Sequence, residues 1–151
     1  MTIVLMFIGA SPGSTGGGIK TTTLAILSFA IISMLKGKKD ISVFKRRIPN
    51  DNFREASGLV FLAATFIFVI VMILLIREPF RFEDIIFEAI SAFGTVGLSR
   101  GITPFLSSQG KILITLLMYI GRVGPLTLIY AFAQKKNYSN IHYDEESIAI
   151  R

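Results

Sequence analysis

The sequence predicts an all-α integral membrane protein, because its apolar residues are gathered in long blocks without charge. Hydrophobic residues make up 52% of the 151 positions, and the mean hydropathy is +0.62. The block at residues 57–76 contains twenty uncharged positions, enough for a helix to cross about 30 Å of hydrocarbon. A second block at 112–133 is interrupted only by Arg122, and a shorter third block occupies 21–35. We therefore expect several helices at membrane depth.

The basic residues predict how these helices are oriented. Seven of them lie in the connection between residues 36 and 54, three more follow the last apolar block, and four lie on the opposite side of the membrane. Cytoplasmic loops carry the excess of lysine and arginine, so we expect a multi-pass protein of the plasma membrane with a cytoplasmic C-terminus. The net charge of +6 is interpreted through this topology and not as a sign of nucleic-acid binding.

The N-terminal residues 1–9 are apolar but too short to span a membrane. They lead, as a short helix or strand, into a glycine-rich segment at membrane depth, where irregular backbone has to be buried in protein or line a watery cavity. No basic region precedes them, so we expect no cleavable signal peptide. The chain has no cysteine, which excludes disulfides and thiolate metal sites.

The glycine-rich segment at residues 11–23 reads SPGSTGGGIKTTT and holds four of the 13 glycines. Such a backbone can turn its N–H groups toward a phosphate, or its carbonyl groups toward a dehydrated cation. A phosphate-binding P-loop places lysine directly after its last glycine, but here Ile19 stands between Gly18 and Lys20. The following run, 21–35, carries no charge and no polar face, which argues against a P-loop. A P-loop nucleotide-binding protein stays an alternative.

A second, weaker glycine motif follows residues 82–93, which have the apolar spacing of a helix and acidic residues in the first turn, where the helix dipole favours them. About twelve residues are too few to cross the membrane. The TVGL sequence at 95–98 is close to the TVGY core of potassium-channel filters, whose carbonyl oxygens replace the hydration shell of the ion. The C-terminal end of the helix favours a cation through its partial negative charge. A tight turn is the alternative.

Arg122 is the one charge inside the last apolar block. A charge at mid-span is costly and usually faces a pore or a partner. Arg122 lies about eleven residues from either end of a span over 111–133, which makes snorkelling to an interface difficult. The adjacent Gly121, Gly124 and Pro125 are equally compatible with close helix packing and a kink. We expect a functional role for Arg122.

Three motifs together resemble the Trk/Ktr/HKT potassium transporters, and most closely their Ktr-type membrane subunit. They are GASPGSTGGGIKT at 9–21, SAFGTVGLS at 91–99 and YIGRVGP at 119–125. In that family, four repeats of helix, pore loop and helix surround one pore. The resemblance covers essentially the whole chain and implies the third pore loop plus the complete fourth repeat. It assigns 1–56 to the third pore loop, the following inner helix with a gate segment and a cytoplasmic connection, 57–134 to the fourth repeat, and 135–151 to a cytoplasmic C-terminal tail.

The resemblance also implies which residues act on the ion. The backbone carbonyls of a selectivity filter would select dehydrated K⁺ at Ser14, Thr15, Gly16, Gly17, Thr95, Val96, Gly97 and Leu98. A gate below the filter would involve Gly37, Lys38, Asp40 and Arg122. Beyond the transported K⁺ we expect no cofactor and no other bound metal, and we expect no enzymatic activity.

The implied partners are an N-terminal half of the transporter carrying the first two repeats, a second copy in a homodimer, a cytosolic nucleotide-binding ring of RCK/KTN type, and the lipid bilayer. No nucleic acid is expected. A family with this architecture also passes sodium, so K⁺ and Na⁺ both stay open as the ion. A non-conducting, truncated membrane remnant is the alternative function.

Overall fold

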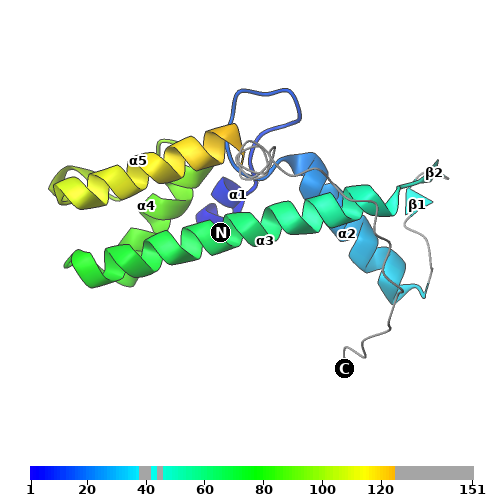
Figure 1. Ribbon diagram of the computed structural model, residues 1–151, viewed down its shortest axis with the longest axis horizontal. Helices are drawn as coiled ribbons and strands as arrows, with labels where there is room; N and C mark the ends of the chain where they lie inside the picture. Colours follow the sequence, from blue (N-terminus) through cyan, green and yellow to red (C-terminus); the bar gives the residue numbers. More distant parts are fainter. Residues whose placement is uncertain (38–41, 44–45, 125–151) are drawn as a thin grey trace, which may run out of the picture.

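The protein is built almost entirely from helices. Its computed structural model (Figure 1) describes residues 1–37, 42–43 and 46–124. The helices are α1 (Thr2–Phe7), α2 (Thr21–Leu35), α3 (Asn50–Arg77), α4 (Phe82–Gly94), the 3-10 helix η1 (Thr103–Phe105) and α5 (Ser108–Val123). Between α2 and α3, the strands β1 (Ser42–Val43) and β2 (Arg46–Arg47) form a short antiparallel pair. The predicted all-helical fold is confirmed for the described residues, apart from this pair.

α3 contains the predicted span 57–76 and is long and apolar enough to cross a membrane. Within its 27 residues Asp51–Arg77, the most apolar window has a hydropathy of 3.3, and 28% of that window is buried. A helix in the core of a soluble protein would be mostly buried, whereas most of this window is not buried. The helix ends two residues before Pro79, which cannot continue it. Among the described residues, α3 alone meets this length and composition, while α2 is apolar but shorter.

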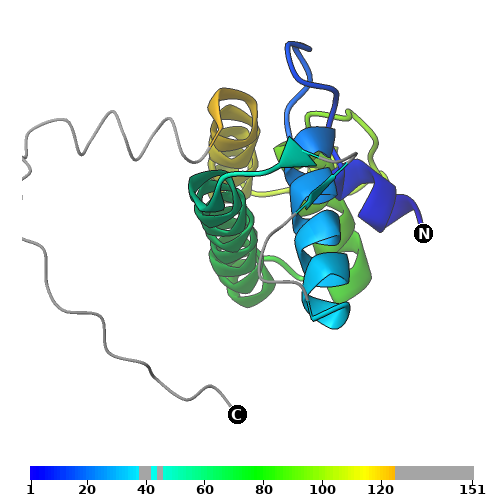
Figure 2. The same ribbon diagram turned by 90° about the vertical axis from the view of Figure 1, so that its right-hand side faces the viewer.

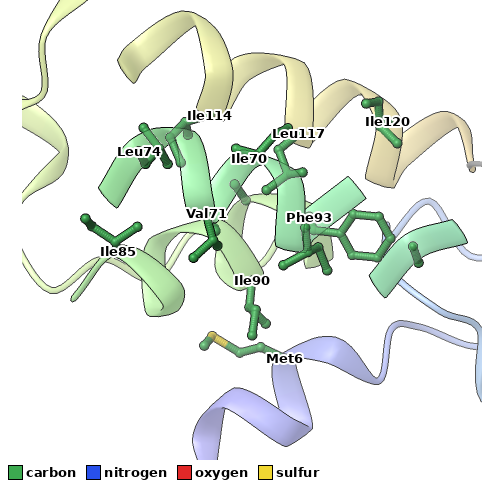
Figure 3. Packing of buried hydrophobic residues seen from close by; sticks show 14 of the residues in the cluster. Met6, Ile70, Val71, Leu74, Ile85, Ile90, Phe93, Ile114, Leu117 and Ile120 are labelled. Atoms are coloured by element: carbon green, nitrogen blue, oxygen red, sulfur yellow. The ribbon is translucent and has the colours of Figure 1, made fainter. Parts of the chain in front are cut away.

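The short helix α4 lies at the centre of the core and packs against α1, α3 and α5. Figure 3 shows this packing from close by: Ile85 and Phe93 of α4 belong to one cluster with Leu74 of α3 and Leu117 of α5. The rings of Phe7 and Phe93 are stacked, with centroids 6.3 Å apart. A helix of 13 residues is about 20 Å long, too short to cross a bilayer. α4 therefore ends inside the protein.

The outer faces of the long helices are apolar and exposed. α2 packs beside the N-terminal part of α3 (Figure 2), and much of its remaining surface is uncovered. Exposed large apolar side chains include Ile31, Met34, Leu35, Phe61, Phe68, Ile76, Ile112 and Tyr119. Water-soluble proteins rarely expose an apolar surface this extensive. The surface fits contact with lipid or with further protein.

α5 is shorter than the sequence predicts. It ends one residue before Gly124, which adopts φ +88, so the predicted span over 111–133 is interrupted at Gly124. The cause is local, because a residue at positive φ cannot continue a right-handed helix. Arg122 lies in the last turn of α5 with an exposed side chain. Residues 125–151, which hold the end of the predicted fourth repeat and the predicted tail, lie outside the described residues.

Candidate functional site: the junction of two glycine loops

The first glycine-rich segment forms a loop between α1 and α2 whose two ends lie side by side. Ile8 and Ile19 form an isolated parallel bridge, and the Gly9 amide donates to the Ile19 carbonyl at 2.8 Å. Ile19 is fully buried, so the neck of the loop is anchored in the core while its tip stands out from the helices (Figure 1). In the tip, the Ser14 hydroxyl accepts a hydrogen bond from the Gly16 amide at 3.3 Å.

The second glycine loop leaves the end of α4 through a strained residue. Thr95 has φ +52 and is the one non-glycine residue at positive φ in the described ranges. Its amide donates to the Ala92 carbonyl, and the Val96 amide donates to the Ser91 carbonyl, both at 3.0 Å. A β-branched residue in this conformation costs about 1–3 kcal/mol, which its surroundings have to offset. Gly97 follows at φ +80.

The two loops contact each other at Gly17 and Thr95. The Gly17 amide donates to Oγ1 of Thr95 at 2.8 Å, and the Gly18 amide donates to the Gly121 carbonyl of α5 at 3.2 Å. A Cβ on Gly17 would lie 2.7 Å from Cγ2 of Thr95 and 3.0 Å from the Gly121 carbonyl oxygen. Glycine is required here because neighbouring atoms already fill the space of a side chain. The bond from Gly17 helps to offset the strain at Thr95.

The end of α5 packs against the end of α4 beside this contact, at Gly121. A Cβ on Gly121 would overlap the Phe93 carbonyl oxygen and lie 2.7 Å from the Phe93 carbonyl carbon. The backbone of α1 approaches Gly94 in the same way, because a Cβ on Gly94 would lie 2.5 Å from the Met6 carbonyl oxygen. The first loop, α1, α4 and α5 therefore meet backbone to backbone. We call this contact the glycine junction; it consists of Gly17, Gly18, Gly94, Thr95 and Gly121.

The glycine junction lies level with the middle of α3 along its length, not at either end (Figure 1). In a bilayer crossed by α3, the junction is thus at membrane depth. Irregular backbone is tolerated there where it is buried in protein or faces a watery cavity. Both glycine loops contribute such backbone, and their buried part is the junction itself.

The predicted filter residues fall into two sets in the structure. Gly17 is buried and Thr95 half-buried in the glycine junction. The others lie at the loop tips, half-buried or exposed: Gly16, Ser14, Thr15, Val96, Gly97 and Leu98. The structure thus joins the two loops through one residue of each and leaves the other six at the surface of this chain.

The predicted gate residues are described only in part. Gly37 follows the end of α2 at Leu35 and adopts φ +63. Lys38 and Asp40 lie outside the described residues. Arg122 directly follows Gly121, whose carbonyl bonds the first glycine loop. Arg122 is therefore attached to the glycine junction through the backbone of α5.

Sequence reasoning missed two buried carboxylates near the loops. Glu88 and Glu78 are only 5% and 6% exposed. Glu88 accepts hydrogen bonds from the segment after the second glycine loop, and Glu78 accepts them from the N-terminus of α5. The sequence could have indicated Glu88, because this acid lies beyond the first turn of an apolar helix. A carboxylate buried there without a hydrogen-bond partner would be costly, so its position predicts a partner.

The long apolar helix, the short interior helix and the glycine junction define a helical membrane protein in which two glycine loops meet at mid-helix depth. The chain belongs to the TrkH family, described as "Cation transport protein", whose profile matches residues 1–141. The resemblance carried by the three sequence motifs is thereby confirmed. Its relatives are transporters and not enzymes. The P-loop alternative is wrong, and the fold gives a reason: a P-loop follows a β-strand, whereas this loop follows α1.

Three relatives illustrate the similarity. The chain is 43% identical over 146 residues to Ktr system potassium uptake protein D of Bacillus subtilis, covering 97% of the chain and 32% of the relative. It is 42% identical over 147 residues to Ktr system potassium uptake protein B of the same organism, covering 97% and 33%. Potassium/sodium uptake protein NtpJ of Enterococcus hirae is 43% identical over 156 residues, covering 99% and 35%. The chain therefore spans about a third of the length of these curated relatives.

Proposed function

We propose that the chain forms the third pore loop and the complete fourth helix–pore loop–helix repeat of a potassium uptake system. Backbone carbonyls of its two glycine loops select dehydrated K⁺. The observation that carries the proposal is the 2.8 Å hydrogen bond from Gly17 to Thr95, because it joins the two loops that a shared filter needs. Family membership and the names of the relatives, which are potassium uptake proteins, support the same function.

The direction of α4 adds to this support. The helix begins with Glu83 and Asp84 in its first turn and ends at the second glycine loop. Its C-terminal carbonyl groups and their partial negative charge therefore lie at this loop, where they favour a cation. The exposed loop tips leave a surface for two further pore loops, which we assign to an N-terminal half with the first two repeats.

The charge distribution supports an orientation in the plasma membrane. We assign the α2–α3 connection and the C-terminal tail to the cytoplasm, because this side of the predicted topology carries ten basic residues against four on the other. The proposed parts are 1–56, 57–134 and 135–151, as the family resemblance implies.

The exposed apolar faces contact lipid and a second copy in a homodimer, and an RCK/KTN-type nucleotide-binding ring binds at the cytoplasmic side. That two relatives are named as proteins of a Ktr system supports such a regulatory partner.

The filter assignment predicts that Gly16→Ser and Gly97→Ser lower the preference for K⁺ over Na⁺. Gly97 has φ +80, and a Cβ on Gly16 would lie 2.7 Å from Cβ of Ala10. Serine therefore strains or displaces the carbonyls that coordinate the ion. The measurement is K⁺ and Na⁺ uptake by a chimera in which the N-terminal two thirds of the Bacillus subtilis Ktr protein B precede residues 1–151, expressed in cells deficient in potassium uptake.

Gly13→Ser is the matched control for Gly97→Ser. Both glycines have φ close to +80, and a Cβ at either position meets open space, but Gly13 is not a predicted filter residue. We expect the control to keep the parent ion preference. Unchanged preference in both filter variants contradicts the assignment. A chimera that reaches the membrane without restoring uptake favours the non-conducting remnant instead.

Arg122→Ala is expected to raise uptake or to make it less dependent on the cytosolic partner. We propose that the Arg122 guanidinium holds the gate of the assembled pore from the side of the glycine junction. Within this chain the 15 residues of α2, about 22 Å of helix, separate the junction from Gly37, so Arg122 does not bond the end of α2 directly. Arg122→Lys should be intermediate, because an ammonium keeps the charge but loses the planar fork. The initial rate of K⁺ uptake by the chimera, with and without the ring, measures both effects. Parent rates and unchanged regulation in Arg122→Ala contradict a gating role.

A further inference from the structure

Glu88 is a buried acid on α4 that faces the protein and not water. It is 5% exposed, and its neighbour Ala89 is fully buried in the core. An ionisable side chain in such a place has to be matched by hydrogen-bond donors, because an unmatched one costs several kcal/mol. The donors of Glu88 come from a single segment of the chain, residues 99–103, which directly follows the second glycine loop.

Both carboxylate oxygens of Glu88 bind this segment. Oε1 accepts from the Arg100 amide at 3.1 Å and from the Ser99 hydroxyl. Oε2 accepts from the Thr103 hydroxyl at 2.9 Å. The Ser99 hydroxyl in turn accepts from the Gly101 amide at 2.9 Å. One side chain thus fixes three residues of the segment directly and a fourth through Ser99.

The segment has two other anchors, because Ile102 is buried in the core and the Arg100 guanidinium pairs with Asp84 of α4 at 3.2 Å. A pocket of about 150 Å³ lies between the segment, α4 and α5, and its lining includes Glu88, Gly97, Leu98 and Met118. Side chains that would otherwise press the loop into place are therefore absent from this pocket. Gly97 and Gly101 adopt φ +80 and φ +91, and glycines lose more conformational freedom on ordering than other residues. The hydrogen bonds to Glu88 help to offset both the open pocket and the flexibility of the two glycines.

We propose that Glu88 is a positioning residue that holds residues 97–103 and thereby fixes the Gly97 carbonyl for the cation. This inference rests on the proposed function, because it assigns the second glycine loop to a filter. Glu88 does not touch the ion in this scheme. It acts through Ser99, Arg100 and Thr103, which connect its carboxylate to the backbone that leaves Gly97.

Amide hydrogen exchange tests the positioning step without any transport. In the 151-residue chain in lipid nanodiscs, Glu88→Ala should speed exchange of the Arg100 and Gly101 amides about tenfold or more, because hydrogen bonds to a charged group are lost. Glu88→Gln should give a smaller rise, since its amide oxygen still accepts from Arg100. The Val96 amide, which donates to Ser91, should exchange at the parent rate in both variants.

Ion preference in the chimera tests the functional step. Glu88→Ala should lower the ratio of K⁺ to Na⁺ uptake severalfold, and Glu88→Gln should restore part of it. Glu83→Ala is the matched control, because Glu83 lies on the same helix, is 77% exposed and only approaches Arg100 at 3.8 Å. It should leave both exchange and ion preference unchanged.

Each result decides the proposal. Parent exchange rates in Glu88→Ala overturn it, and so does faster exchange with an unchanged ion preference. If Glu88→Ala does not reach the membrane, Glu88→Gln is measured instead, and parent behaviour of that variant in both assays overturns the proposal. A parent chimera that transports no K⁺ refutes the proposed function and the filter role of Glu88 together, while the exchange data show separately whether Glu88 holds the loop.

Discussion

Gly121→Ala should prevent α5 from docking on the end of α4. The added Cβ would overlap the carbonyl oxygen of Phe93 and lie 2.7 Å from its carbonyl carbon. These are backbone atoms at the end of a buried helix, so they cannot turn aside as a side-chain tip can. Overpacking of a tight core costs about 1–3 kcal/mol and sometimes more. We expect at least about 3 kcal/mol here, because the same contact also holds the Gly18 amide on the Gly121 carbonyl.

Gly58→Ala is the matched control for this prediction. Gly58 also lies inside a helix, α3, but a Cβ there would meet no atom within 4 Å. Alanine favours a helix over glycine by about 0.5–1 kcal/mol, so this variant should be as stable as the parent or slightly more so. Thermal unfolding of the chimera in detergent, followed by size-exclusion chromatography, measures both. Equal stability of Gly121→Ala and the parent would contradict the backbone contact between α4 and α5.

Glu78→Ala should release the N-terminus of α5 from the end of α3. The Glu78 carboxylate accepts a hydrogen bond from the Ser107 amide at 3.2 Å and another from the Ser107 hydroxyl. That hydroxyl also accepts from the Gly110 amide at 3.1 Å, which caps the helix. Loss of the carboxylate removes charged hydrogen bonds and a favourable charge at a helix N-terminus. We expect a loss of about 2–4 kcal/mol in unfolding free energy.

Two further variants distinguish the loss of the Glu78–Ser107 hydrogen bonds from a nonspecific loss of stability caused by the mutation. Glu78→Gln keeps one acceptor for Ser107 and should recover about half of the loss. Ser107→Ala removes the cap and should cost about 1 kcal/mol. Denaturant titration of the chimera in mixed micelles gives all three values. If Glu78→Ala is as stable as the parent, the carboxylate does not hold α5.

The sequence predicted the elements whose signal is continuous along the chain. The uncharged run at 57–76 lies within α3, and the apolar spacing of 82–93 corresponds to α4, because burial and membrane contact both select apolar residues over many successive positions. The end of α5 was not predictable in this way. Residues 111–133 are apolar on both sides of Gly124, and only the backbone shows that this glycine takes φ +88 and ends the helix.

The site shows the same division between local and long-range information. The sequence by itself determined that two glycine-rich loops follow short apolar segments, and it determined the family. Only the tertiary structure decided that Gly17 is packed against the Thr95 side chain and Gly121 against the Phe93 backbone, while Gly97 is at positive φ in open space. It also decided that Glu88 serves a segment eleven to fifteen residues away. The physical reason is that glycine serves two purposes: it leaves room for close packing, and it tolerates a positive φ. A buried carboxylate, in turn, requires hydrogen-bond donors. The atoms that pack against Gly17 and Gly121, and the donors that bind Glu88, come from residues distant in sequence.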